Sequence, residues 1–423
     1  MHVLCQSAIY RRIGIVQIQH TELYNNLQAK PHLASYVHAV QWYCGIEVPP
    51  VDLASKTPQR QISVDNARHL LRSTLKVLRL CFNVRALNIS VAATNPHNIV
   101  PEVGLSEVDL LNEWIPLIPF PACNLVIRLP FFDKLTHITF SNETAEPMYM
   151  LPFMLQILLS STAVVALHSN FIMTDTQASR YAQRHRTGTA MHKLCWTSFG
   201  TQQLEGEYDP ELIGVHRAGL ISLIKTANKT LREIRIIFNV TLAISDLTDF
   251  DIGTLNQVTS FHIGTVDIRA DAGEPQWARF CLTIPACQKL HVDLASMSAR
   301  NLRNSIRDLS QCGLRRLERL FISGAWGLDE LDEEVVRSLQ PFYDRQTFPR
   351  LTNLQLNLPW HLDTVRTAPS AINTSTQEGR LLPWHEIATV MDPSASLVVF
   401  MPCFGTSSQR VTIRRSSITV AEF

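Results

Sequence analysis

The feature that most constrains this chain is an apolar pattern at positions i, i+3 and i+5 that recurs along its length. The pattern corresponds to one entry residue followed by two inward-facing positions of a short β-strand, which is the strand portion of a leucine-rich repeat. From residue 135 onward, successive copies start about 30 residues apart. The clear copies start at residues 84, 135, 231, 258, 287, 317 and 351, and weaker copies start at residues 37, 164 and 194. This near-constant spacing predicts a repeat array.

Stretches with helical features lie between the predicted strands. Pro210 directly after Asp209 is typical of a helix start, and residues 298–309 carry apolar side chains at helical spacing, with Gly313 beyond their end. Strands and helices that alternate at this pitch give parallel strands joined by right-handed crossovers. We therefore predict an α/β fold, a leucine-rich-repeat-like solenoid with parallel strands on the concave face and helices on the convex face.

One apolar segment invites comparison with a membrane span. No Asp, Glu, Lys or Arg occurs between Pro147 and Thr174. A spanning helix needs about 20 mainly apolar residues, whereas Pro152 and a Ser-Ser-Thr triplet interrupt this segment. We predict a short buried helix over residues 151–159 and a strand over residues 163–167, with no membrane partner.

Charge and cysteine content narrow the class of protein. Lys and Arg number 38 and Asp and Glu 37, so the formal net charge of +1 favours neither nucleic acid nor an anionic membrane as a partner. With 46% hydrophobic and 18% charged residues, the chain is expected to bury a large core. Its nine cysteines are scattered without a CxxC pair. That pattern predicts buried free thiols in a reducing compartment, the cytoplasm or nucleus.

Sequence-local catalytic motifs are absent. The chain has no GxGxxG, no P-loop, no GxSxG and no HExxH motif, although His361 and Asp363 lie close together in the sequence. We expect a non-enzymatic protein with no cofactor and no metal ion. An enzyme of unknown reaction on an α/β framework is the alternative, which a deep pocket with a strongly shifted titratable pair would support.

The predicted binding site is the concave face of the sheet. Side chains alternate along a strand, so the residues between and after the two inward positions point to this face. Trp, Tyr and Arg dominate protein-binding hot spots, and the alternative is that this face is polar for solubility alone. The candidate protein-binding residues are His137, His168, Trp196, Arg235, His262, Lys289, His291, Arg319, Phe321, Asn353 and Gln355.

Histidine recurs on this predicted face at residues 137, 168, 262 and 291. Histidines in neighbouring strands are about 4.8 Å apart at the backbone, which is compatible with a shared metal ion for the pairs 137/168 or 262/291. No carboxylate or thiol completes a defined ligand set in the pattern, so no metal site is predicted.

The N-terminal segment resembles a known family. Residues 4–13, LCQSAIYRRI, resemble the junction in fungal F-box proteins at which the last F-box helix ends in an LYRxI-like strand. Residues 22–24, ELY, and 31–37, PHLASYV, are similar to the helix that leads to the first strand of a divergent leucine-rich array in that family. The later segments FDKLTHI at 132–138 and FPRLTNL at 348–354 also resemble segments of that family.

The resemblance implies a substrate-recognition subunit of a ubiquitin ligase, which binds the Skp1 adaptor of a cullin ligase through its F-box. Only the end of the F-box matches and the LPxEI-type opening helix is missing, so we expect most or all of the F-box to be lacking. A truncated relative that acts as a non-ligase scaffold or decoy is the alternative. The expected organisation is an F-box junction and lead-in helix at 1–35, a single solenoid at 36–400 and a polar C-terminal tail at 401–423.

Overall fold

The chain folds into two compact units, Met1–Thr230 (unit 1) and Leu231–Phe423 (unit 2). The division after Thr230 falls inside the segment predicted as a single solenoid. The structure is a computed structural model. It describes residues 2–15, 20–46, 74–93, 129–143, 150–186, 189–198, 210–243, 253–267, 276–297, 299–326, 338–343, 346–357, 396–402, 408–414 and 417–422.

Unit 1 is built on parallel strands that are neighbours in chain order. Its elements are α1 (His2–Tyr10), β1 (Arg12–Ile15), α2 (His20–Ala29), α3 (Pro31–Ala34), β2 (Ala39–Ile46), β3 (Ala86–Ala93), η1 (Phe132–Lys134), β4 (His137–Asn142), α6 (Pro152–Ser160), β5 (Ala166–Ser169), α7 (Asp175–Arg184), β6 (Lys193–Ser198) and α8 (Pro210–Ala227). Each strand pairs in parallel with the next, and α6 and α7 lie in the crossovers that parallel pairing requires. Because β1 pairs with β2, the sheet begins before residue 36, inside the predicted lead-in segment.

Unit 2 continues the same alternation and ends in an antiparallel hairpin. Its elements are β7 (Glu233–Ala243), β8 (Ser260–Asp267), α10 (Gln276–Cys281), β9 (Lys289–Met297), α11 (Ala299–Ser310), β10 (Arg319–Trp326), η2 (Gln340–Tyr343), β11 (Asn353–Asn357), β12 (Ser396–Pro402), β13 (Ser408–Arg414) and β14 (Ser417–Glu422). Strands β7 to β12 pair in parallel. The predicted polar tail at 401–423 instead contains β13 and β14, which extend the sheet in antiparallel pairing.

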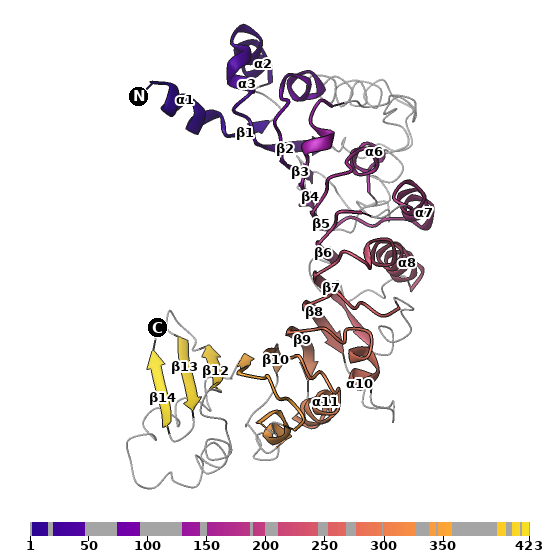
Figure 1. The fold of residues 1–423 in the computed structure, drawn as a ribbon, viewed down its shortest axis with the longest axis vertical. Helices are drawn as coiled ribbons and strands as arrows, with labels where there is room; N and C mark the ends of the chain where they lie inside the picture. Colours follow the sequence, from indigo (N-terminus) through magenta and orange to yellow (C-terminus); the bar gives the residue numbers. More distant parts are fainter. Residues whose placement is uncertain are drawn as a thin grey trace, which may run out of the picture. The chain divides into compact units, whose positions relative to one another are not determined.

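The apolar core confirms the repeat pattern. In unit 2 the first inward positions of neighbouring strands form one register row, and each is at most 1% exposed: Ile234, Phe261, Leu290, Leu320 and Leu354. The corresponding row of unit 1 is also buried: Val40, Leu87, Ile138, Leu167 and Leu194. Within each unit the helices that follow β1 or connect later strands lie along one side of the sheet (Figure 1). The fold is therefore an α/β solenoid of parallel strands and alternating helices, as predicted.

A repeated backbone hydrogen-bond pattern fixes the start of the strands. The carbonyl oxygen of Arg232 accepts from the amides of Thr259 and Ser260 at 2.9 and 3.0 Å. Two consecutive amides donate in the same way to the carbonyls of Arg11, His38, Arg85, Thr136, Val165, Thr259, Gln288 and Glu318. Each of these strands therefore takes its register from the preceding one, even where the segments between them differ in length.

The helices expected between the strands agree with the structure where it describes them. Helix α11 occupies the predicted stretch at 298–309, and Gly313 beyond it has a φ of 64°, the left-handed conformation that ends many helices. Helix α6 matches the helix predicted at 151–159, whereas strand β5 begins at Ala166, three residues later than the strand predicted at 163–167. Helix α8 begins at Pro210. No helix among the described residues is long and apolar enough to cross a membrane.

Candidate functional site

The predicted binding residues of unit 2 lie on the side of its sheet opposite the apolar core. We call this set the unit 2 strand face: Arg235, His262, Lys289, His291, Arg319, Phe321, Asn353 and Gln355. Each of these residues is exposed or half-buried, whereas the alternating neighbours Phe261, Leu290 and Leu320 are buried. Strand alternation thus separates a helix-covered apolar side from a polar side.

Register places several of these residues side by side. Arg235, His262, His291, Phe321 and Gln355 are successive Cα partners across β7 to β11. Residues that are directly paired across neighbouring strands bring their side chains into contact distance. Accordingly, the His291 ring lies 5.6 Å from the Phe321 ring, measured between centroids. The face therefore carries a continuous row of large polar and aromatic side chains.

The neighbouring row places two cations directly opposite each other. Lys289 and Arg319 are Cα partners in β9 and β10, and both are exposed. Like charges at directly paired positions destabilise a sheet. Within the described part of the chain, neither side chain forms an ion pair. This part of the face therefore presents positive charge to the solvent.

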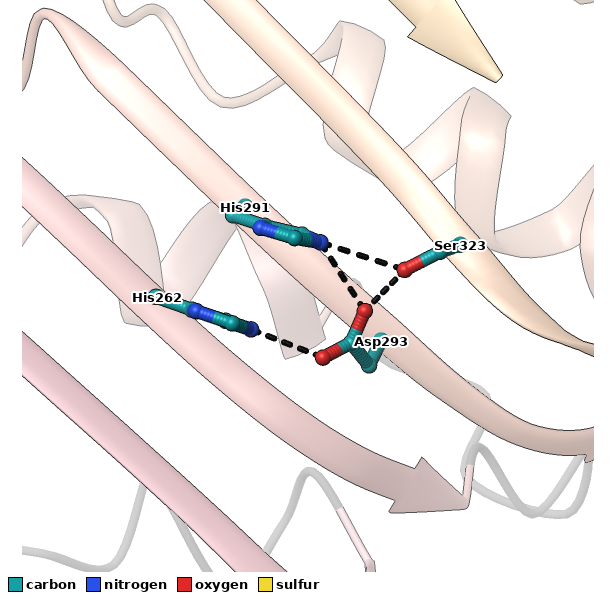
Figure 2. A network of polar contacts seen from close by, with 4 residues as sticks. All are labelled: His262, His291, Asp293 and Ser323. Atoms are coloured by element: carbon teal, nitrogen blue, oxygen red, sulfur yellow. Dashed lines mark hydrogen bonds and ion pairs between the residues drawn. The ribbon is translucent and has the colours of Figure 1, made fainter. Parts of the chain in front are cut away.

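A network of four side chains lies on strands β8, β9 and β10 (Figure 2). The Nε2 atom of His262 lies 2.7 Å from Oδ2 of Asp293, and Nε2 of His291 lies 2.9 Å from Oδ1 of the same carboxylate. The hydroxyl of Ser323 donates to Oδ1 of Asp293 and lies 3.1 Å from Nε2 of His291. The two imidazole rings stack with centroids 3.8 Å apart and planes inclined by 6°.

Strand geometry explains why these groups meet. His291 and Asp293 are two residues apart in β9 and so point to the same face. His262 is the Cα partner of His291, and Ser323 is the Cα partner of Asp293. Gly264 supplies the space, because a Cβ atom at this position would lie 3.3 Å from Oδ2 of Asp293. The carboxylate can therefore turn toward β8 and reach His262.

The network sets the ionisation state of its carboxyl group. Burial alone would raise the pKa of Asp293. Hydrogen bonds from His262, His291 and Ser323, together with the charge of His291, outweigh burial and hold the pKa well below its usual range. Asp293 is therefore a carboxylate at neutral pH. Because a carboxylate is only an acceptor, both imidazole Nε2 atoms donate to it.

The arrangement differs from a nucleophilic triad. In a triad the acid and the serine occupy opposite nitrogens of the imidazole, whereas Asp293 and Ser323 both contact Nε2 of His291. The hydroxyl of Ser323 donates to the carboxylate instead of to a base. The side chains of His262, His291 and Asp293 do fit another chemistry, since their ligand atoms all lie within 4.8 Å of one another and could hold a metal ion. His361 and Asp363 lie outside the described residues.

The sequence pattern paired His262 with His291 and placed Asp293 on the same face, but it did not join Asp293 to the two histidines as a ligand. Asp293 follows His291 by two residues, so the motif His-x-Asp within a strand was the available signal. Its contact with His262 depends on the register between β8 and β9, and the carboxylate packs closely against Gly264, where a Cβ atom would lie 3.3 Å from Oδ2; neither feature is visible in periodicity. The expectation that no carboxylate completes the set is therefore corrected: Asp293 completes it.

The predicted histidines of unit 1 do not form a similar pair. His137 is the Cα partner of Ala166, and His168 is the partner of Thr139, so the two histidines occupy different register rows. Both are exposed. His137 contacts the hydroxyl of Thr136 through Nδ1 at 2.9 Å. Strand pairing thus shows that His137 and His168 are not direct partners, whereas His262 and His291 are. The sequence pattern alone did not reveal this difference.

Trp196 corrects the predicted strand phase in β6. The pattern took Leu194, Thr197 and Phe199 as the repeat copy, which placed Trp196 on the exposed face. In the structure Trp196 is 0% exposed, and Met191 and Leu194 are buried with it. The copy is therefore Met191, Leu194 and Trp196, a shift of three residues. Because strand side chains alternate with a period of two, this odd shift exchanges the two faces.

The fold and the surface together define an α/β solenoid-like repeat protein with a polar strand face in unit 2. Its sequence matches no protein-family model and no curated protein. The structure is therefore the basis on which a function can be proposed.

Proposed function

We propose that the chain is a non-enzymatic protein-binding repeat protein, which holds an acidic segment of a partner protein against the unit 2 strand face. The observation that carries this proposal is the direct pairing of Lys289 with Arg319 in neighbouring strands. Such a pair costs stability in the unbound sheet. A carboxylate of a bound partner would offset this repulsion, so the pair gives a physical reason for an acidic ligand.

The surroundings of this cation pair supply the other contacts that a binding surface needs. Phe321 and His291 lie in the adjacent row and offer apolar and aromatic area. Arg235 lies in the same row as His291, at its β7 end. Binding energy in protein interfaces is concentrated in such aromatic and arginine anchors, surrounded by weaker polar contacts. Asn353 and Gln355 provide polar groups of that kind.

The proposal can be tested by removing the cations of the face and comparing the result with an equal loss of charge elsewhere. The face variant combines Arg235→Ala, Lys289→Ala and Arg319→Ala. The control variant combines Arg279→Ala, Arg307→Ala and Arg315→Ala, three exposed cations outside the strand face. Each protein is immobilised and used to capture partners, which are identified by mass spectrometry and then measured singly for affinity.

We expect partners held by the unaltered chain and by the control variant to be lost from the face variant. Truncating one central anchor costs on the order of 2 kcal/mol, or roughly 30-fold in affinity. Because the contacts are between opposite charges near solvent, affinity should also fall as salt is added. Equal binding by the two variants would show that recognition does not use the unit 2 strand face.

A role in a ubiquitin ligase is proposed from the resemblance of residues 4–13 to the F-box junction. It is supported by the order of α1 (His2–Tyr10) followed directly by β1 (Arg12–Ile15), which is the helix-to-strand order of that junction. The test is co-purification of Skp1 and a cullin with the chain. Recovery of both supports a substrate-recognition subunit, whereas specific partners without Skp1 support a scaffold or decoy.

A further inference from the structure

Three metal-binding atoms come together on the unit 2 strand face. His262, His291 and Asp293 each offer one ligand atom, and these atoms lie within 4.8 Å of one another. In both rings Nε2 is the nitrogen beside the carboxylate. The three side chains are 16%, 36% and 33% exposed. We propose that these three residues bind one divalent transition-metal ion, with Zn²⁺ as the best match, and leave a coordination position open to solvent.

The ligand types select the class of ion. Two imidazole nitrogens and one carboxylate oxygen suit Zn²⁺ and its neighbours in the first transition row, whereas Mg²⁺ and Ca²⁺ prefer oxygen ligands alone. Zinc sites that keep an exchangeable position use three protein ligands and a water molecule. His262, His291 and Asp293 supply those three ligands, and their partial exposure gives water access to the fourth position.

The distances are close to what one ion requires. Two ligand atoms that are each ~2.1 Å from an ion can be at most ~4.2 Å apart. Both nitrogen-to-carboxylate distances, 2.7 and 2.9 Å, already lie inside that limit. The limit on the whole set is 4.8 Å, which exceeds the separation that one ion allows by roughly half an ångström. Because the two rings are stacked nearly in parallel, they must also tilt so that both Nε2 lone pairs point to the ion.

Metal binding replaces the hydrogen bonds between the two histidines and Asp293 with bonds from all three side chains to the ion. No covalent bond within the protein is formed or broken. In the metal-free network each imidazole donates its Nε2 proton to Asp293. An ion needs the lone pair of Nε2, so each neutral ring changes tautomer: it gives its Nε2 proton to solvent and takes one from solvent on Nδ1. The carboxylate that accepted from both rings then coordinates the ion.

Neighbouring residues position the ligands in advance. Ser323 donates a hydrogen bond to Oδ1 of Asp293 and so orients the carboxylate from β10. Hydrogen bonds from such outer residues are a regular part of metal sites, and their loss typically lowers metal affinity by ~10- to 100-fold. Gly264 keeps the space into which Oδ2 turns. We infer that Ser323 is a positioning residue for this site.

The inference goes beyond the proposed protein-binding function. Metal binding needs no partner protein, and partner binding through Lys289 and Arg319 needs no metal. The outcome of one test therefore does not decide the other.

The experiment is a titration of the full chain, stripped with a chelator, with Co²⁺ and then with Zn²⁺. Co²⁺ reports its ligands through its visible absorption, and Zn²⁺ is followed by its displacement of Co²⁺ and by calorimetry. The variants are His262→Gln, Asp293→Asn and Ser323→Ala, and the matched control is His137→Gln, which removes an exposed strand histidine of unit 1. Circular dichroism of each variant verifies that it is folded.

We expect one Co²⁺ per chain, displaced by Zn²⁺, with a spectrum of nitrogen and oxygen ligation. Loss of a direct ligand in His262→Gln or Asp293→Asn should weaken binding by more than ~100-fold, and Ser323→Ala by ~10-fold. The His137→Gln control should bind as the unaltered chain does. The proposal is overturned if the chain binds no Co²⁺, if these variants bind it unchanged, or if an intense thiolate-to-cobalt band shows that cysteines hold it. His262→Gln and Ser323→Ala keep the test decisive if Asp293→Asn fails to fold.

Discussion

His262 and His291 stack with their ring centroids 3.8 Å apart and their planes inclined by 6°, although they come from different strands. Two charged imidazolium rings at this distance would repel each other, and a single carboxylate can offset only one positive charge. The carboxylate of Asp293 accepts from both rings, one at each oxygen. The carboxylate of Asp293 therefore helps to hold the two stacked rings together.

Replacing Asp293 with Asn should lower the free energy of unfolding by about 1 kcal/mol. Hydrogen bonds to a charged group contribute roughly 1.5–3 kcal/mol, and the partial exposure of this carboxylate reduces that value. Urea unfolding of metal-free protein, followed by circular dichroism, measures the change. Asp133→Asn, which alters an exposed carboxylate of unit 1, is the control and should change stability by less than about 0.5 kcal/mol. Equal effects of the two substitutions would contradict the view that Asp293 holds the rings of His262 and His291 in place.

Phe261 and Phe321 offer a comparison of the two sides of one sheet. Phe261 is 1% exposed and lies 5.2 Å from Phe280 in an edge-to-face contact, whereas Phe321 is half-buried on the strand face. Phe261→Ala is expected to cost about 3–5 kcal/mol of stability, as for other buried phenylalanines. Phe321→Ala should cost about 1 kcal/mol, because less apolar area is lost from contact. A similar loss from both, measured by urea unfolding, would mean that the two faces are wrongly assigned.

The strands and the core could be predicted from the sequence because burial imposes a simple period. Val258, Phe261 and Ile263 follow the i, i+3, i+5 pattern, and all three are buried. The same pattern failed at β6, where two overlapping copies compete and the copy that buries Trp196 is the one that forms. A pattern that many sequences satisfy predicts that a strand is present more reliably than it predicts which side chains face the core. A shift of the pattern by an odd number of residues exchanges the two faces.

The contacts of the site could not be predicted in the same way. That His262 and His291 face the same side follows from alternation, but the contact of His262 with Asp293 depends on register and on the close packing at Gly264. Likewise, the carbonyl of Arg232 accepts hydrogen bonds from the amides of Thr259 and Ser260. These are backbone contacts, so the pattern of side chains in the sequence does not reveal them. Such features depend on how repeats stack, which local spacing does not encode.

The described cysteines are expected to resist alkylation in the folded protein. Cys81, Cys195, Cys281, Cys287 and Cys312 are buried, and none of them is in a disulfide bond. Burial raises the pKa of Cys81 to about 12, and because the thiolate is the reactive form, this thiol is unreactive near pH 8. Iodoacetamide treatment followed by peptide mass spectrometry should label Cys81 only after denaturation. Rapid labelling of Cys81 in the folded chain would contradict its burial.

His185 should make unit 1 less stable as the pH falls. Its ring is 7% exposed and lies 4.4 Å from the ring of Tyr181. Burial lowers the pKa of His185, and the charge of Arg184 lowers it further, against a backbone hydrogen bond at Leu158 that raises it. The folded state thus favours the neutral ring. Below the ordinary histidine pKa of about 6.5, the unfolded chain binds a proton that the folded chain excludes, so stability declines with acidification.

The measurement is urea unfolding of the unaltered chain and of His185→Phe at about pH 7.5 and about pH 5.5, where the linkage acts. The phenylalanine keeps an apolar ring beside Tyr181 and removes the titration. The unaltered chain should lose more stability between these two pH values than the variant does, and the difference between the two losses isolates His185 from the other titrating groups. Parallel losses would show that His185 gains its proton as readily in the folded chain as in the unfolded one.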